Sequence, residues 1–237
     1  MLFWTKPKCF LVRRQHCTDL TRWEVLSIFT LKNPKLNRKS GNAYVRYSSA
    51  NSEKTGHFDY NLGFGKFASL TSVTYSDFGD QRIGKSGDFG TFGDFGKNLY
   101  NVTRVDNKDV VSTNPNPYIM AGSGYKQIDV LEKILYQQNE HVSHMLNLQY
   151  SNNIGNLPRY DRMLELSYDK TTKTMLPTYA EWNYGPQKRF LGAYTLDINK
   201  QNRWFDDAKF ILSFQSLDQD RISRKLHKTN RKTQMEA

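Results

Sequence analysis

Apolar and polar residues alternate with a period of two through most of this chain from Gly41 onward, and this alternation limits the fold more than any other feature. In "HFDYNLGF", every second residue from Phe58 to Phe64 is apolar, and polar Asp59 and Asn61 lie between them. Successive side chains of an extended strand point to opposite faces, whereas the spacing of three and four residues typical of helices hardly occurs. Further runs of this kind are Val142–Tyr150, Leu164–Tyr168, Phe190–Ile198 and Ala208–Phe214. The pattern predicts strands of roughly ten residues with one apolar and one polar face.

Short turn sequences separate several of these runs: "GFGK", "QQNEH" and "NKQNRWFD". Strands joined by short turns pair with their sequence neighbours in an antiparallel sheet. The sequence therefore predicts an all-β protein built as an antiparallel up-and-down meander. Two architectures satisfy this pattern: a soluble sandwich, which buries the apolar face against a second sheet, and an outer-membrane barrel, which turns that face to lipid.

Strand length and aromatic placement favour the barrel. Tilted strands need about 9 to 11 residues to cross the hydrocarbon layer, whereas strands of soluble sheets most often have about 5 to 6. Aromatic rings near strand ends are typical of the girdles of outer-membrane barrels, and ordinary cross-strand pairing is the alternative explanation. The aromatic residues near predicted strand ends are Tyr44, Tyr47, Tyr75, Tyr136, Tyr150, Tyr168, Trp182, Tyr184 and Trp204.

A long segment from Gly79 to Gly124 breaks the alternation and is rich in Gly, Asn and Pro. Segments of this length without clear periodicity are uncommon inside compact soluble domains. Outer-membrane barrels combine short periplasmic turns with long external loops, so residues 79–124 are predicted to form one such loop.

Charge and hydropathy exclude several classes of protein. The chain carries 34 Lys and Arg against 23 Asp and Glu, but the basic residues cluster near its two ends and are otherwise scattered, so we expect no nucleic-acid partner. It has no apolar run long enough for a transmembrane helix, and "MLFWTKPKCFLVRRQHC" does not read as a signal peptide. The only cysteines are Cys9 and Cys17, which excludes a disulfide scaffold.

Two glycine motifs suggest nucleotide chemistry. "GDFG" occurs at Gly87–Gly90 and Gly93–Gly96, but the other residues of a kinase site are missing, so a loop repeat is the better interpretation. "GFGKFA", at Gly63–Ala68, fits a dinucleotide pattern, but that motif works only when a helix follows. Because β-forming residues follow instead, the motif predicts a hairpin turn.

Three polar motifs are equally weak. His141 and His144 are three apart, so on a strand they point to opposite faces and cannot close on one metal ion. Asn101 fits a glycosylation sequon by chance, and Ser123 in "AGSGY" lacks the first glycine of a nucleophile elbow. We therefore expect no catalytic residues, no metal ligands and no cofactor, and we expect that the protein is not an enzyme. The residues that would contact a cofactor or ligand stay unknown.

Taken together, four stretches resemble the barrel of TonB-dependent outer-membrane receptors, most closely the haemoglobin, transferrin or lactoferrin receptors found in Bacteroidota. The resemblance extends from about Lys32 to the C-terminus. Two stretches make it specific: "PRYDR" (158–162) and "YGPQKR" (184–189). The four stretches are residues 41–85, 141–168, 179–197 and 218–234.

The resemblance implies a plug domain inside a closed barrel of 22 strands. The plug of such receptors ends in a motif close to Leu-Tyr-Gly-Ser-Asp-Ala-Met-Gly-Gly-Val-Ile-Asn-Phe-Tyr, directly before a segment like "KNPKL". "KNPKL" is present at Lys32–Leu36, but the plug motif is not. Cys17–Thr30 can be encoded by codons that would yield that motif if they were read one base earlier. We therefore expect residues 1–31 to be an ill-defined, out-of-frame remnant of the plug end, and residues 32–237 to be the N-terminal part of an incomplete barrel, about eight to ten strands.

The function implied by the resemblance is uptake of an iron or haem source across the cell outer membrane. The expected partners are outer-membrane lipid, an extracellular ligand such as iron, haem or a carrier protein, and an energy-transducing protein of the TonB type that contacts the missing N-terminal region. The chain ends at "RKTQMEA", before the barrel would close, so we expect it not to function by itself. The alternative is a self-standing β-sheet surface or binding protein that uses the glycine-rich loop for contact.

Overall fold

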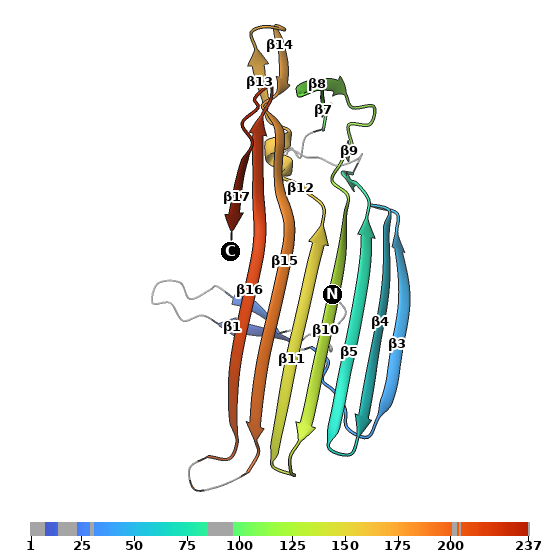
Figure 1. Ribbon diagram of the computed structural model, residues 1–237, viewed down its shortest axis with the longest axis vertical. Coiled ribbons are helices and arrows are strands. Elements are labelled where there is room, and N and C mark those ends of the chain that lie inside the picture. The colour runs from blue at the N-terminus through green and yellow to red at the C-terminus, as the bar shows by residue number, and fades with distance from the viewer. Residues whose placement is uncertain are drawn as a thin grey trace.

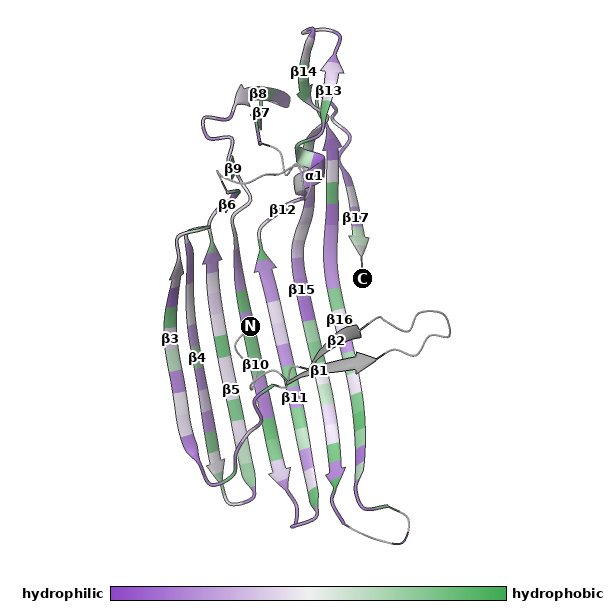
Figure 2. Cartoon of the chain, turned by 180° about the vertical axis from the view of Figure 1, so that it is seen from behind, coloured by the Kyte–Doolittle hydropathy of each residue, from purple (hydrophilic) through white to green (hydrophobic). Residues whose placement is uncertain are grey.

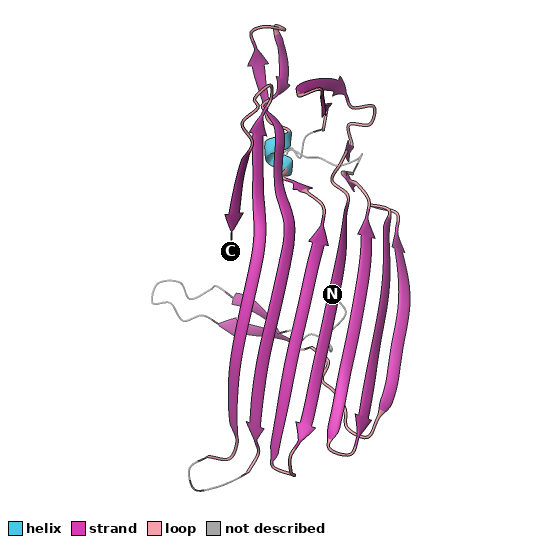
Figure 3. Ribbon diagram, viewed as in Figure 1, coloured by secondary structure: helices cyan, strands magenta, loops and turns pink. Residues whose placement is uncertain are grey.

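The computed structural model describes residues 8–13, 23–28, 31–84, 97–200, 203 and 205–236. The chain is all-β, as predicted, with one large antiparallel sheet and several short hairpins (Figures 1 and 3). The large sheet has nine strands, eight of which form the path β17-β16-β15-β11-β10-β5-β4-β3, and β12 pairs with β15. These strands are β3 (Lys39–Ser48), β4 (Glu53–Phe64), β5 (Phe67–Phe78), β10 (Tyr125–Gln137), β11 (Val142–Ile154), β12 (Leu157–Pro158), β15 (Tyr179–Ile198), β16 (Ala208–Lys225) and β17 (Lys232–Glu236).

The eight strands of the path follow one another in chain order, so the sheet is the predicted up-and-down meander. Five of them, β4, β5, β10, β11 and β16, have 12 to 18 residues, and β15 has 20. These lengths exceed the usual soluble strand of about 5 to 6 residues. The sheet is open in the described part of the chain, with β3 and β17 at its two edges.

Connections at the two ends of the sheet differ in length. At one end, residues 65–66, 138–141 and 199–207 join successive strands, as predicted from their sequences. At the other end, residues 79–124 join β5 to β10 and residues 155–178 join β11 to β15, and the short turns at residues 49–52 and 226–231 join β3 to β4 and β16 to β17 (Figure 1). We call this second end the rim. The excursion of residues 79–124 begins and ends where the alternation breaks in the sequence, and its position outside a membrane stays a prediction.

The rim carries the smaller elements. The excursion of residues 79–124 contains the pair β6 (Gln81–Arg82) and β9 (Ile119–Met120) and the hairpin β7 (Tyr100–Val105) and β8 (Lys108–Thr113). Residues 155–178 contain helix α1 (Tyr160–Met163) and the hairpin β13 (Leu166–Asp169) and β14 (Thr174–Pro177). The prediction of a strand of roughly ten residues around Leu164–Tyr168 is therefore wrong. Asp169 ends β13 because its carboxylate accepts hydrogen bonds from the Thr171 N–H and the Thr172 hydroxyl.

The N-terminal residues are described only in part. The backbones of β1 (Lys8–Arg13) and β2 (Trp23–Ile28) form a separate antiparallel pair. This pair lies on one side of the large sheet, behind it in Figure 1 and in front of it in Figure 2. That residues 1–31 are an out-of-frame remnant stays a prediction, and most of them, including Cys17, lie outside the described residues.

Candidate functional site

The large sheet exposes apolar side chains on one face. Residues that oppose each other in a sheet ladder share a face, so the register links Phe58, Val73, Val130, Tyr150 and Phe190 across five strands. We call this the apolar face. Large side chains on it are 38% to 75% exposed, namely Phe58, Tyr60, Phe64, Phe67, Tyr75, Ile134, Leu146, Tyr150, Phe190, Tyr194, Phe210, Leu212 and Phe214. Figure 2 shows that hydrophobic residues concentrate in the half of the long strands away from the rim.

The apolar face has a limited height. On β15 it extends from Phe190 to Ile198, which is about 26 Å along the strand at about 3.3 Å per residue. Outer-membrane barrels carry an apolar band about 25 Å tall. Polar residues Lys126, Asn152 and Lys188 follow on the same face toward the rim. Glu132 is an acidic residue within the band, and its Oε2 accepts a hydrogen bond of 2.6 Å from the Thr71 hydroxyl.

Aromatic rings line the apolar face near its short turns. Ring centroids are 6.4 Å apart for Phe64 and Phe67, 4.7 Å for Phe67 and Tyr136, and 5.8 Å for Tyr136 and His144. His144 Nδ1 lies 2.6 Å from the Tyr194 hydroxyl oxygen. This row crosses four strands, and Tyr136 lies near a strand end, as predicted.

Tyr44, Trp182 and Tyr184 lie on the other face, so their assignment to an aromatic girdle is wrong. Tyr44 opposes His57, and its ring stacks on that imidazole. Trp182 and Tyr184 oppose Ser223 and Arg221 because β15 holds an extra residue between Tyr184 and Gln187. A bulge of one residue transfers every following side chain to the opposite face. Among the other predicted girdle residues, Trp204 lies outside the described residues and Tyr168 lies on the short β13.

The opposite face of β4, β5 and β10 is buried and mostly polar, with buried Ala68, Leu70 and Leu131 among its side chains, and we call it the polar face. Thr55, His57, Asp59 and Asn61 on β4 are each 5% to 7% exposed, whereas Phe58 between them is 50% exposed. Asp59 is the centre of a hydrogen-bond network: its carboxylate accepts from Lys32 Nζ at 2.8 Å and from Asn42 Nδ2 at 3.0 Å. His57 Nε2 lies 3.2 Å from Asp59 Oδ2, and His57 Nδ1 lies 2.7 Å from Thr74 Oγ1. The network satisfies most of the buried polar groups on this face, as burial requires, but the Ser72 and Tyr44 hydroxyls have no hydrogen-bond partner in the described part of the chain.

The segment of residues 31–38 runs across the polar face. The Asn61 side chain accepts a hydrogen bond from the Lys35 N–H and donates to the carbonyls of Lys35 and Arg38. Lys133 Nζ donates to the Lys32 carbonyl at 2.9 Å and to Asn33 Oδ1 at 2.8 Å. A cavity of about 340 Å³ remains between this segment and the sheet. The "KNPKL" segment is therefore held against the sheet by the Asn61 amide, the Lys133 ammonium group and the ion pair between Lys32 and Asp59.

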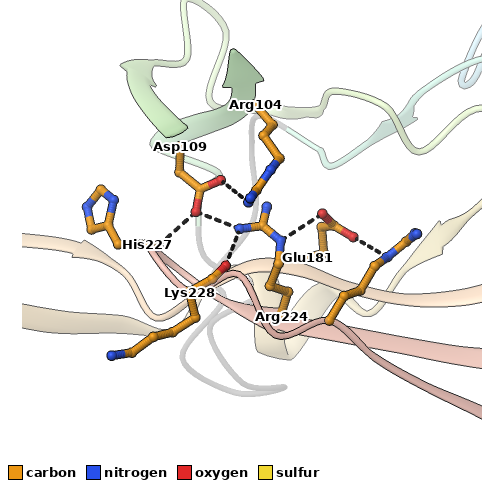
Figure 4. Close-up of polar contacts among 7 residues, drawn as sticks. Arg104, Asp109, Glu181, Arg224, His227 and Lys228 are labelled. Atoms are coloured by element: carbon orange, nitrogen blue, oxygen red, sulfur yellow. Dashed lines mark hydrogen bonds and ion pairs between the residues drawn. The ribbon is translucent and has the colours of Figure 1, made fainter. Parts of the chain in front are cut away.

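A cluster of charged residues joins the excursion of residues 79–124 to the rim ends of β15 and β16 (Figure 4). Arg224 donates through Nη1 to Asp109 Oδ2 at 2.6 Å and through Nε to Glu181 Oε1 at 3.0 Å. The Arg224 and Asp109 side chains are 4% and 0% exposed. Arg104 Nη1 lies 3.3 Å from the second oxygen of Asp109. A buried ion pair requires such additional partners, because each charge loses its hydration.

The surroundings of Asp109 affect its ionisation. Burial by itself raises the pKa of the Asp109 carboxyl, but hydrogen bonds from Arg224 and the His227 N–H outweigh it, together with the charge of Arg104. The net pKa lies below its ordinary value, so the carboxylate is the stable form. Sequence analysis missed this pair because Asp109 and Arg224 are 115 residues apart and no local pattern connects them.

The glycine motif at Gly63–Ala68 forms the predicted hairpin turn. β4 ends at Phe64 and β5 begins at Phe67, so only Gly65 and Lys66 turn the chain. Gly65 has a φ of +52°, which a glycine adopts without steric cost. Both "GDFG" repeats lie outside the described residues.

The other sequence motifs do not converge on one site. Ser123 is fully buried: its hydroxyl accepts from the Gln81 N–H and donates to the Met120 carbonyl, so it closes the base of the excursion. His141 lies in a turn with Nδ1 2.9 Å from the Asn199 carbonyl oxygen, away from the partners of His144. Asn101 lies on β7. Within the described part of the chain, no three residues of the His, Cys, Asp or Glu type are grouped to hold a metal.

Comparisons with protein-family models, curated proteins and solved structures gave no match. Among the described residues, no helix is long and apolar enough to cross a membrane. A functional proposal for this chain is therefore based on its own geometry: the two faces of the large sheet and the charged cluster at the rim.

Proposed function

We propose that this chain is part of the barrel wall of a TonB-dependent receptor in the cell outer membrane. The apolar face contacts lipid, and the polar face lines the interior. The observation that carries the proposal is the inverted burial of β4: polar Asp59 and Asn61 are 5% exposed, whereas Phe58 and Phe64 are 50% and 60% exposed. In water, this arrangement leaves a large apolar surface uncovered, which soluble monomers rarely do.

Two further features support this assignment. The apolar face has the height expected of a lipid-facing band, and aromatic rings follow its turn side. Both long excursions leave the same end of the sheet, which also carries the short turns at residues 49–52 and 226–231, whereas the connections at the other end have two to nine residues (Figure 1). Outer-membrane barrels likewise carry their long loops at one end. On this proposal, the rim faces the cell exterior.

The resemblance of residues 32–237 to receptors for haemoglobin, transferrin or lactoferrin extends the proposal to the cargo. The complete receptor takes up an iron or haem source, and an energy-transducing partner of the TonB type drives release. The alternative, a self-standing β-sheet binding protein, requires a cover for the apolar face.

Spin labels on the two faces of β11 test the lipid contact. Leu146 lies on the apolar face and its neighbour Asn147 lies on the polar face. Each is changed to Cys in a chain with Cys9→Ser and Cys17→Ser, refolded in lipid bicelles, labelled with a nitroxide and examined by electron paramagnetic resonance. Oxygen concentrates in hydrocarbon and a nickel chelate stays in water. We expect the label at Leu146→Cys to collide mainly with oxygen and the label at Asn147→Cys mainly with nickel.

The neighbouring pair is its own control, because both labels occupy the same depth in one strand. Preferential nickel access at Leu146→Cys contradicts the lipid contact. Equal exclusion of both reagents there indicates that protein covers the apolar face, as the alternative function requires.

A further inference from the structure

A basic cavity lies at the rim, between the ends of β15, β16 and β17. Its volume is about 370 Å³. Four of its lining residues are cations, and no described residue that lines it is acidic. The lining residues that matter here are Trp182, Ser223, Arg224, Lys225, Lys228 and Lys232.

The two carboxylates that pair with Arg224 of the lining are held by arginines on both sides. Glu181 accepts from Arg224 Nε at 3.0 Å and from Arg231 Nε at 2.9 Å. Asp109 is held by Arg224 and Arg104. By contrast, Lys225, Lys228 and Lys232 form no ion pair with a carboxylate in the described part of the chain. The cavity therefore has an uncompensated positive charge.

The turn that carries two of these lysines is held from several directions. Arg224 Nη1 donates to the Lys228 carbonyl at 3.1 Å, and the His227 N–H donates to Asp109 Oδ2 at 2.8 Å. The Leu226 N–H donates to the Thr178 carbonyl at 3.1 Å. The backbone positions of Lys225 and Lys228 are thus set before any ligand arrives, which lowers the entropic cost of binding.

Two arginines flank Trp182, the aromatic wall of the cavity, and one of them, Arg159, also pairs with Asp161 at 2.7 Å. The Arg159 guanidinium lies 4.9 Å from the centroid of the Trp182 ring, and the Arg221 guanidinium lies 5.9 Å from it. Both cations contact the indole in the geometry of cation–π pairs. Trp182 is in this place because of the bulge in β15, which transfers it to the polar face.

We propose that this cavity binds a soluble ligand with two or more phosphate groups. Lysines act as separate point charges toward phosphate, and several around one cavity favour a polyvalent anion over a single charge. A lipid headgroup fits less well, because Ser223 lies about 16 Å along β16 from Asp218, which borders the apolar face. Ser223 also lies on the opposite face of the sheet from the apolar side chains. The site does not depend on the proposed membrane function.

Calorimetric titration with inorganic pyrophosphate tests the site on the full chain, refolded in uncharged detergent at constant ionic strength. We expect saturable binding with one pyrophosphate per chain. Lys228→Gln with Lys232→Gln is expected to weaken binding about tenfold or more, because each lysine contributes a charged hydrogen bond. The matched control is Lys170→Gln with Lys173→Gln, which removes two exposed charges from the β13–β14 turn. This control should keep the affinity of the unchanged chain.

All three proteins should give the same β-sheet circular dichroism, since the four lysines are exposed. The proposal would be overturned if the titration gave only the heat of dilution, or if the control pair of substitutions weakened pyrophosphate binding as much as Lys228→Gln with Lys232→Gln does. A second arm adds phosphatidylglycerol to the micelles. If that lipid displaces pyrophosphate from the unchanged chain, the cavity binds the phosphate of a lipid headgroup, and the proposal of a soluble ligand is wrong.

Discussion

At the scale of single residues, one amide side chain fixes the path of a whole segment. Asn61 is on the polar face of β4, and its side chain makes three hydrogen bonds to the backbone of Lys35 and Arg38. The sequence places Asn61 on the polar face by alternation alone. Its partners follow only from the tertiary structure, because residues 35 and 61 are far apart in the chain.

Asn61→Ala is therefore expected to loosen residues 32–38. It removes the partner of the Lys35 N–H and carbonyl and one of the two donors to the Arg38 carbonyl, which the Gly63 N–H also contacts at 2.9 Å, at a cost of about 1 kcal/mol or more. Hydrogen exchange followed by mass spectrometry should show amides in this segment exchanging about tenfold faster or more. The matched control is Asn153→Ala on the same face, where the Asn153 Oδ1 has no hydrogen-bond partner in the described part of the chain. Equal acceleration in both variants contradicts a specific role for Asn61.

At the scale of elements, a buried charge pair attaches the β7–β8 hairpin, which does not pair with the strands of the large sheet. In the described part of the chain, β7 and β8 pair only with each other, and Asp109 on β8 contacts Arg224 on β16. A hairpin of two strands is marginally stable by itself, so this contact contributes strongly to its position. The alternation of the sequence indicates the long strands but says nothing of this attachment.

The attachment should weaken in acid. The pKa of Asp109 is lowered in the folded chain, so its stabilisation is complete above the ordinary pKa of about 4 and is lost as the pH falls through the lowered value. A nitroxide on Val110→Cys, in a chain with Cys9→Ser and Cys17→Ser, should show restricted motion near neutral pH and increased mobility below about pH 4.

Two substitutions complete this test. Asp109→Asn should make the label mobile at every pH, because the charge that Arg224 and Arg104 hold is removed. Asp161→Asn should leave the acid transition unchanged, since Asp161 is 57% exposed and pairs with Arg159 on the surface. A transition that is unaffected by Asp109→Asn assigns the pH dependence to another group.

At the scale of the whole molecule, the large sheet has two open edges. β3 presents an unpaired ladder along Lys39–Ser48, and Val45 and Tyr47 on it are 89% and 66% exposed. Unpaired edges bind other strands and are not tolerated in hydrocarbon. We therefore expect the refolded chain to associate through its edges, so that it enters lipid as an oligomer and not as a monomer.

Val45→Lys should reduce this association, because a charged residue on an edge strand discourages pairing. Size-exclusion chromatography with light scattering should show a smaller mean mass than for the unchanged chain. Val105→Lys is the control, since Val105 is 53% exposed on β7 and lies away from the β3 edge. Monomeric behaviour of the unchanged chain, with the heat-modifiable gel migration of a closed barrel, contradicts the open edges.

The sequence by itself determined the strands, their two faces and most of their turns, because alternation and turn chemistry act between neighbouring residues. Phe58 and Asp59 fall on opposite faces of β4 as their order in the chain requires. Only the tertiary structure decided which distant groups meet, such as Asp109 and Arg224, because such contacts depend on how long excursions return to the sheet. It also decided the face of Trp182. Strict alternation would place Trp182 on the same face as Phe190. The strand β15 bulges between them, where Gly185 lies close to Asp220. The additional residue in the bulge moves Trp182 to the opposite face.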